Sequence, residues 1–336
     1  MGIRDVAKRA GVSVATVSRT VNGVRSVSPE IAARVWSAVN AVGYVPNTQA
    51  RALVSGRSRI LGLIVSDITN PFYPELIQGF EQFAVQAGYE VLLGATNYDP
   101  AMMATTVRRM IERKVEGVAV MTSEIEPSLM EQLTGRSIPL VFVDIGPPGR
   151  RIGNIQVNYE AGIRQAVQHL YRLGHRRLAF IGGPGDLKSA QLRRESFLRC
   201  TSGSRWKGAR PLMLEGDHKL AGGCAAVQRL LSATPRPTAV FCSNDLTAIG
   251  VLRGLDVEGL RAPQDLSVIG FDDIQMAEYS IPPLTTVRLP RLDLARQAFQ
   301  SLMAGLDEKS APGHQPVPIE TSLVVRGSTA RIGAGG

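Results

Sequence analysis

The sequence contains few cysteines and histidines, and neither set is spaced as metal or redox sites are. The cysteines, Cys200, Cys224 and Cys242, are an odd number, and no two of them lie at metal-ligand or redox spacing. The four histidines show no zinc spacing either. These absences argue against a disulfide scaffold and a zinc site, so we expect free thiols, a reducing compartment, no metal and no cofactor.

Long apolar runs are also missing. No run approaches the roughly 18 residues that suggest a membrane span, and no apolar segment follows the positive charges of the N-terminus. We therefore expect no membrane partner and a cytoplasmic location. With 336 residues, 44% of them hydrophobic, the chain is long enough for two or three domains with buried cores.

Acidic residues are scarce in the first 60 positions. This stretch carries nine Lys and Arg against only Asp5 and Glu30, a net charge of +7 out of +9 for the whole chain. A small basic segment on a nearly neutral body indicates a polyanionic partner for that segment. A charge-rich solvated surface is the simpler alternative.

Three short helices are predicted within the first 45 residues. The first covers about 4–10 and ends at Gly11, and Ser13 is placed to cap the second by accepting from the backbone of Thr16. The third begins at Ser28-Pro29-Glu30 and ends at Gly43. The short link between the first two helices predicts a helix-turn-helix, whose second helix is the reading element.

The second helix has one buried and one outward face. Val17 and Val21 are expected to face inward. The outward side chains are small ones, an arginine and an amide, as close approach to a DNA major groove requires. The predicted DNA contacts on this segment are Ser13, Val14, Ala15, Thr16, Ser18, Arg19 and Asn22. An ordinary solvent-facing helix is the alternative.

The stretches "IRDVAKRAGVSVATVSRTVNG", "VSPEIAARVWSAVNAVGYVPN" and "QARALVSGRSRILGLIVSDITNPFY" resemble the lactose-repressor (LacI/GalR) family of bacterial transcription factors. The similarity extends to "TSLVVRGST" at 321–329. The resemblance implies a hinge over 47–59 that orders on operator DNA, with Leu53 as the apolar wedge in the minor groove. From the residues alone, this acid-free segment also fits a flexible tether.

From residue 60 onward, apolar strand patterns alternate with helix-sized segments. Such a pattern predicts parallel sheets covered on both faces. We expect two doubly wound subdomains in a periplasmic-binding-protein-like body, with 284–290 as a crossover and a helix over 291–306. The predicted strands are 60–65, 90–95, 117–121, 140–144, 177–183, 238–243 and 266–273, and the predicted helices include 74–88, 101–114, 158–174 and 244–259.

The predicted domains are a helix-turn-helix head over 1–46, the hinge over 47–59 and an effector-binding and dimerisation domain over 60–336. Subdomain one covers about 60–157 plus 290–315, and subdomain two about 158–289 plus 316–329.

Polar and aromatic residues follow the predicted strands, where ligands bind in such folds. The resemblance implies a cleft for a small effector lined by Phe72, Asp144, Ser189, Arg193, Asn244 and Asp272. Tyr73 and a predicted loop over 184–193 also follow strands, so we expect Tyr73 to line the same cleft. Asp67 with Asn70, Asp245 and Asp273 also follow strands, but Asp67 and Asp245 fit helix caps equally well. A sugar or sugar acid is the expected effector class, and a purine the second.

Two other functions fit the sequence less well. An enzyme is disfavoured because the glycines of "GGPGD" at 182–186 lack G-x-G-x-x-G spacing, and because "GVSVA" at 11–15 follows no strand as a nucleophile elbow would. A periplasmic-type sugar-binding protein without a transcriptional role fits the body but not the basic head. We therefore expect a homodimeric, effector-controlled transcriptional regulator, usually a repressor, that binds a pseudo-palindromic operator.

Overall fold

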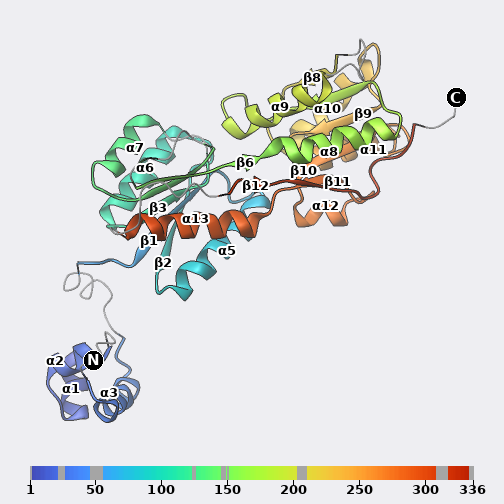
Figure 1. Cartoon of the computed structure of the whole chain (residues 1–336). Helices are drawn as coiled ribbons and strands as arrows, with labels where there is room; N and C mark the ends of the chain where they lie inside the picture. The colour runs from blue at the N-terminus through green and yellow to red at the C-terminus, as the bar shows by residue number, and fades with distance from the viewer. Residues whose placement is uncertain are drawn as a thin grey trace. The chain divides into compact units, whose positions relative to one another are not determined.

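The computed structural model describes residues 2–21, 27–45, 56–122, 126–144, 149, 151–202, 210–307 and 317–332. The chain divides into two compact units, which we call the head (1–59) and the body (60–336). Figure 1 shows the helices of the head and the two lobes of the body.

The described part of the head contains the three predicted helices, α1 (Ile3–Ala10), α2 (Val14–Val21) and α3 (Pro29–Val42). Gly11 ends α1 with a φ of 64°, a left-handed conformation that glycine adopts without steric cost. A side chain there would also meet Arg34, whose Nη2 donates to the carbonyl oxygen of Ala10 at 2.5 Å. Ser28 caps α3 by accepting from the backbone of Ile31.

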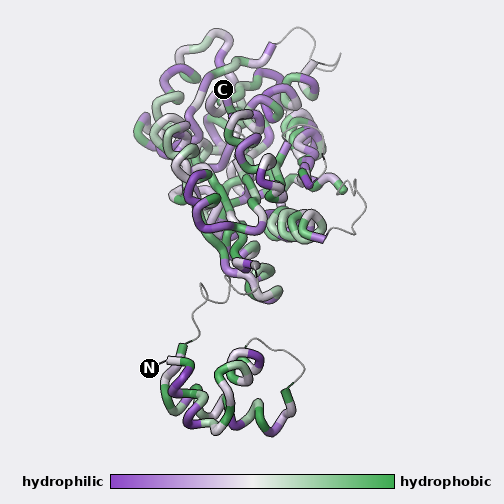
Figure 2. The backbone as a smooth tube through the Cα atoms, turned by 90° about the vertical axis from the view of Figure 1, so that its left-hand side faces the viewer, coloured by the Kyte–Doolittle hydropathy of each residue, from purple (hydrophilic) through white to green (hydrophobic). Residues whose placement is uncertain are grey.

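A small core holds these helices together. Val6, Val17 and Val35, one from each helix, are fully buried, and Val21 is only half-buried at its edge. Figure 2 shows hydrophobic and hydrophilic residues alternating along the head helices. The burial of Val17 and Thr20 explains why α2, a segment rich in valine and threonine, which are modest helix formers, stays helical here.

Lobe one of the body is built on a five-stranded parallel sheet with the order β2-β1-β3-β4-β5. Its strands are β1 (Ile60–Val65), β2 (Glu90–Ala95), β3 (Gly117–Val120), β4 (Leu140–Val143) and β5 (Ile152–Ile155). Its helices are α5 (Phe72–Gln86), α6 (Pro100–Glu112), α7 (Pro127–Thr134) and α13 (Arg291–Leu306). The three interior strands, β1, β3 and β4, are mostly buried, as expected for a sheet covered by helices.

Lobe two is built on a six-stranded sheet with the order β13-β11-β10-β9-β7-β8, in which only β13 is antiparallel to its neighbour. Its strands are β7 (Leu178–Ile181), β8 (Leu212–Leu214), β9 (Ala239–Cys242), β10 (Ser267–Asp272), β11 (Thr285–Arg288) and β13 (Ser322–Val324). Its helices are α8 (Tyr159–Arg172), α9 (Lys188–Thr201), α10 (Leu220–Ser232), α11 (Asp245–Val257) and α12 (Gln275–Tyr279).

The described chain passes between the lobes at three places. Two of them, β6 (Val157–Asn158) and β12 (Ile319–Glu320), pair in parallel as a short ribbon, which Figure 1 shows between the lobes. The third is Leu289 with Pro290, between β11 and α13. The predicted architecture of two parallel-sheet subdomains is confirmed.

Two predictions about the body need correction. The segment 284–290 is not a crossover throughout, because 285–288 form β11, an interior strand of lobe two. The segment 184–193 is not a loop throughout, because α9 begins at Lys188 and carries Ser189 and Arg193. β11 is hydrogen-bonded to β10 on one side and to β13 on the other, and α9 packs against α8, which accounts for the regular structure.

Candidate functional site

The second helix of the head presents the predicted reading surface. Ser13 accepts from the backbone of Thr16 at 3.1 Å, as predicted, and so satisfies a free N–H of the first turn. Val14, Ala15 and Arg19 are exposed, whereas Thr16 and Ser18 are half-buried. The remaining predicted DNA contacts, Asn22 and Leu53, lie outside the described residues.

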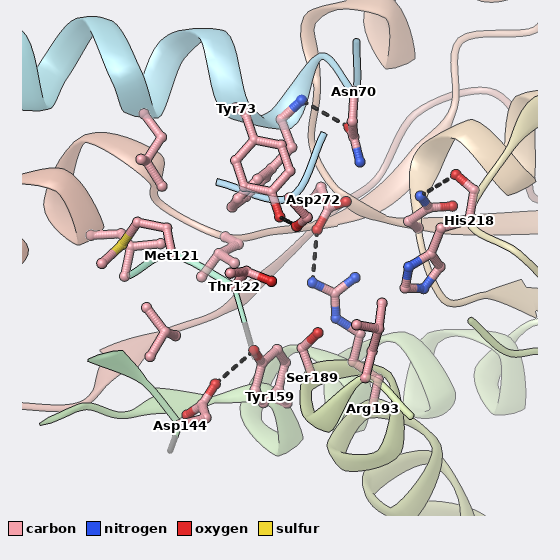
Figure 3. A pocket seen from close by; sticks show the side chains of 18 of the residues that line it. Asn70, Tyr73, Met121, Thr122, Asp144, Tyr159, Ser189, Arg193, His218 and Asp272 are labelled. Carbon is pink, nitrogen blue, oxygen red and sulfur yellow. Dashed lines mark hydrogen bonds and ion pairs between the residues drawn. The ribbon is translucent and has the colours of Figure 1, made fainter. Parts of the chain in front are cut away.

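The body contains a cleft between the two lobes at the carboxyl ends of the strands. The space enclosed there is about 700 Å³ when the part open to solvent is counted. The structure brings all seven predicted effector residues together on its wall: Phe72, Tyr73, Asp144, Ser189, Arg193, Asn244 and Asp272. Figure 3 shows polar side chains pointing into this cleft from several elements.

A buried ion pair joins Arg193 of α9 to Asp272 at the end of β10. Arg193 Nη2 lies 3.0 Å from Asp272 Oδ1, and Nη1 donates to the carbonyl oxygen of Ser243 at 2.6 Å. The guanidinium carbon lies 4.0 Å from the centre of the Phe271 ring. Burial raises the pKa of Asp272, and the nearby Arg193 opposes this rise. Arg193 Nε is buried and makes no hydrogen bond with the described residues.

A second carboxylate, Asp144, lies at the end of β4. Its Oδ1 accepts from the backbone of Val157 at 3.0 Å, and its Oδ2 accepts from the hydroxyl of Tyr159 at 2.8 Å. Both donors belong to the segment that enters lobe two, so Asp144 also ties the lobes together at the crossover. Burial raises the pKa of Asp144, and these hydrogen bonds oppose the rise.

The first turn of α5 forms the aromatic part of the wall. Phe72 and Tyr73 are arranged edge to face, with ring centres 5.3 Å apart. The Tyr73 hydroxyl is hydrogen-bonded to Ser66 at 2.5 Å, and burial raises the pKa of this tyrosine. Asn70 accepts from the backbone of Phe72 at 3.0 Å and so fixes the start of the helix. The wall therefore combines a flat apolar surface with a hydroxyl and an amide group whose positions are fixed by hydrogen bonds.

Beside Asn244, the cleft contains a buried neutral histidine. His218 Nε2 is hydrogen-bonded to the Ser243 hydroxyl at 2.9 Å, and burial, together with Arg193, lowers the pKa of this imidazole to about 3. A side chain at Gly183 would lie 2.0 Å from His218 Nε2, so only glycine leaves room for the ring. Asn244 caps α11 through Thr247 and donates to the carbonyl oxygen of His218 at 2.9 Å.

The other strand-end aspartates hold structure instead of lining the cleft. Asp67 accepts from the backbone and hydroxyl of Thr69. Asp245 is fully buried and accepts from Thr286 and from the backbone of Ile274. Asp273 joins two arginines, Arg288 at 2.6 Å and Arg326 at 2.7 Å. Neither Asp67 nor Asp245 is the helix cap that the sequence allowed, because Pro71 precedes α5 and Asn244 caps α11.

Sequence reasoning missed several residues of the wall. His218 shows no zinc spacing in the sequence, and no predicted strand precedes it. The strand that it follows, β8, has only three residues and is too short to show a pattern. Tyr159 begins α8 directly after the crossover, and a tyrosine in an amphipathic helix reads as core. The further lining residues are Ser66, Leu76, Tyr98, Met121, Thr122, Val143, Leu187, Leu289 and Leu294.

The charges of the cleft limit what it can bind. Among its described lining residues, only Asp144, Arg193 and Asp272 carry formal charge, and the single cation is already paired. Within the described ranges, no group of three or more His, Cys, Asp or Glu side chains is placed to hold a metal ion. The same ranges contain no helix long and apolar enough to cross a membrane. The cleft is therefore suited to hydrogen bonding with a polar organic molecule.

Comparisons with known proteins identify the family of the chain. Residues 2–47 match the family described as "Bacterial regulatory proteins, lacI family", and residues 167–329 match a periplasmic binding protein-like domain. The HTH-type transcriptional repressor PurR of Aliivibrio fischeri (strain MJ11) is 34% identical over 310 residues, covering 91% of this chain and 92% of that protein. The chain belongs to the lacI family.

Solved structures of lacI-family regulators show the same fold. A lac repressor dimer bound to operator and the anti-inducer ONPF is 27% identical, with a TM-score of 0.83 and coverage of 97% of this chain and 98% of that one. The transcriptional regulator CelR in complex with cellobiose is 29% identical, with a TM-score of 0.72 and coverage of 97% and 99%.

The predicted family and fold class are thus confirmed, and the chain is a DNA-binding transcriptional repressor of the lacI family. Its relatives are transcriptional regulators and not enzymes. A periplasmic-type binding protein without a transcriptional role does not account for the lacI-family match over residues 2–47.

Proposed function

We propose that this repressor acts in the bacterial cytoplasm as a homodimer on a pseudo-palindromic operator, under the control of an uncharged sugar or sugar derivative bound in the cleft. The observation that carries the choice of effector is the set of fixed hydrogen-bonding groups around an aromatic wall. Carboxylate and amide groups bind hydroxyls, and the face of Phe72 suits the C–H face of a sugar ring.

An uncharged ligand is preferred to a sugar acid on electrostatic grounds. Arg193 is the single cation among the described lining residues, and Asp272 already pairs with it. Asp144 adds a further negative charge. An anionic ligand would therefore enter a site whose cation is neutralised, at the cost of burying unpaired charge. The bound sugar of the similar CelR complex supports the same choice.

For the head, we propose that α2 lies in the major groove of each half-site. The small side chains of Val14 and Ala15 allow close approach, and Arg19 reaches a guanine edge. Ser13, Thr16 and Ser18 then bind phosphates. Asn22 and Leu53 keep their predicted roles at the end of the reading helix and in the minor groove.

A homodimer is proposed because lobe two exposes apolar side chains close together in sequence. Met276, Tyr279 and Ile281 are 44%, 73% and 93% exposed. Such side chains in so short a segment are typical of a surface that another subunit covers. The similar lac repressor structure is a dimer bound to operator.

The test is a thermal-shift screen of the full chain against uncharged sugars, sugar acids and purines, since a molecule that binds only the folded state raises its stability. We expect stabilisation by an uncharged sugar at 100 times its Kd to be about 2.7 kcal/mol. Stabilisation by hypoxanthine or guanine instead would replace the sugar with the purine class, and a response to sugar acids alone would refute the electrostatic argument.

The site itself is tested by substituting the cleft while DNA binding is measured separately. Arg193→Ala should abolish the response to the stabilising sugar and leave operator binding measurable. Because this change also leaves Asp272 buried without its partner, Ser189→Ala, at a half-buried position of the same wall, provides a milder variant. Arg229→Ala, on the exposed face of α10, is the matched control. A normal response in both cleft variants would place the effector elsewhere.

A further inference from the structure

Arg291, the first residue of α13, contacts both lobes of the body. Its Nε donates to the carboxylate of Glu75, on α5, at 2.7 Å. Its Nη1 donates to the backbone carbonyl oxygen of Asp272, at the end of β10, at 2.6 Å. The side chain of Arg291 is only 10% exposed, whereas that of Glu75 is half-exposed. One guanidinium thus connects two helices of lobe one to a strand of lobe two.

Asp272, which accepts the hydrogen bond from Arg291, also lines the cleft. Asp272 carries its carboxylate toward Arg193 and its carbonyl oxygen toward Arg291. Its backbone has a φ of 112°, a conformation that an aspartate adopts at an energetic cost and keeps only when its surroundings hold it. Arg193 belongs to lobe two and Arg291 to lobe one, so the two arginines hold the same residue from different lobes.

α5, which carries Glu75, also contributes residues to the wall of the cleft. α5 and α13 pack together along lobe one, as Figure 1 shows. Glu75 lies within one turn of Phe72 and Tyr73, which line the cleft. The hydrogen bond to Glu75 already restricts the rotamers of Arg291. The guanidinium therefore loses less conformational entropy when it also donates to the carbonyl oxygen of Asp272.

We propose that Arg291 is a positioning residue that couples occupation of the cleft to the angle between the lobes. This inference rests on the proposed effector function. The contact lies beside the crossover at Leu289 and Pro290, so a change of hinge angle can break it without separating the lobes. A hydrogen bond weakens steeply once its distance and angle leave the normal range, so a small rotation is sufficient. Asp272 itself accepts a hydrogen bond from Arg291, and Phe72 lies in the same helical turn as Glu75, the other acceptor. A ligand that contacts Asp272 or Phe72 therefore affects the residues that hold Arg291.

The experiment compares four variants of the full chain. Arg291→Gln removes the charged fork, Arg291→Lys keeps the charge but not the fork, and Glu75→Gln leaves the guanidinium in place with a weaker partner. Arg296→Gln is the matched control, because Arg296 lies on the same helix, is half-exposed and forms an ion pair with Asp293 of its own helix. Operator affinity is measured with and without D-ribose, D-glucose and cellobiose, on a duplex that the wild-type chain selects from a randomised pool.

We expect Arg291→Gln to change the sugar-free operator affinity, and the ratio of affinities with and without the effective sugar, by about fivefold or more. Glu75→Gln and Arg291→Lys should shift both quantities in the same direction by less, and Arg296→Gln should match the wild type. Melting temperatures and circular dichroism identify any variant that has lost its fold. If Arg291→Gln is unfolded, the affinities of Glu75→Gln test the proposal in its place. Unchanged affinities and an unchanged ratio in folded Arg291→Gln overturn the proposal.

Hydrogen exchange separates this proposal from the choice of effector. In Arg291→Gln without sugar, the crossover amides of 156–158 and 319–321 should exchange faster than in the wild type and in Arg296→Gln. If no sugar affects the wild-type chain, the proposed effector class fails, while exchange at the crossovers and sugar-free operator affinity still decide the role of Arg291. Unchanged exchange at the crossovers in a folded variant contradicts that role.

Discussion

At the scale of single residues, the chemistry of the cleft depends on the ion pair between Arg193 and Asp272. A buried pair of this kind adds little net stability, but removal of one partner leaves the other charge uncompensated and costs about 3–5 kcal/mol. The pair is therefore a source of specificity more than of stability. It fixes the direction of the guanidinium at the wall of the cleft.

The buried imidazole of His218 predicts a pH-dependent stability. Its pKa is lowered to about 3 in the folded body, mainly by burial, so the unfolded chain takes up the proton first as the pH falls through about 6.5. This group's stabilisation is complete above pH 6.5 and is lost toward pH 3. Between pH 6.5 and 4.5, we expect it to lower the free energy of unfolding by about 2–3 kcal/mol.

The measurement is denaturant unfolding of the wild type and of His218→Gln over this pH range. The difference between the two slopes isolates His218 from the buried carboxyl groups, whose raised pKa values act in the opposite direction. Equal slopes for the two proteins would contradict the prediction.

Arg19 is predicted to read one base. Arg19→Ala should cost about 1–3 kcal/mol of specific operator binding and relax base preference at one position in each half-site. Selection of duplexes by the variant measures the preference, and titration at fixed salt measures the affinity. Arg229→Ala serves again as the control for removal of a positive charge. A variant that selects the wild-type operator unchanged would exclude guanine reading by Arg19.

At the scale of elements, the reading helix depends on its ends and on its neighbours. α2 has a single fully buried valine, so the hydrogen bond from Thr16 to Ser13 is a large part of what holds its first turn. Loss of such a cap typically costs about 1 kcal/mol, which corresponds to about a fivefold change in an opening equilibrium.

Ser13→Ala should therefore raise the exchange rate of the α2 amides in the full chain by about fivefold and weaken operator binding. Ser37→Ala, at an exposed position within α3, is the control and should leave α2 exchange unchanged. Equal protection of α2 in both variants would show that packing alone fixes this turn.

The elements that the sequence predicts well are those with local signals. Gly11 marks a helix end through its left-handed backbone, and Ser13 and Ser28 mark helix starts through their side-chain caps. The apolar strands of the body can be recognised from their composition. β8 and α9 were harder to predict. β8 has only three residues, and α9 contributes polar side chains to the cleft, so its sequence has little of the apolar periodicity of a helix.

The same reasoning explains which site residues were found. Asp144 directly follows β4 and Asp272 is the last residue of β10, so their place at the cleft could be predicted from topology. His218 and Arg291 could not, because their roles depend on which elements meet in three dimensions. The second contact of Arg291, with a carbonyl oxygen of the other lobe, has no signature in the sequence.

At the scale of the whole molecule, the head and the body are separate compact units. We predict that a chain with residues 1–59 deleted keeps the thermal shift produced by the effective sugar and loses operator binding. Calorimetry and fluorescence anisotropy measure the two properties on the same sample. Loss of sugar binding together with DNA binding would contradict this modular organisation.

The late position of α13 and β13 in the chain has a consequence for synthesis on the ribosome. Lobe one lacks a helix until residue 306 is made, and lobe two lacks its edge strand until residue 324 is made. The helices of the head, in contrast, are complete within the first 45 residues and emerge first. A nascent or prematurely terminated chain thus carries a finished DNA-reading unit before either half of its sensor exists, which makes translation to the end a condition for control as well as for stability.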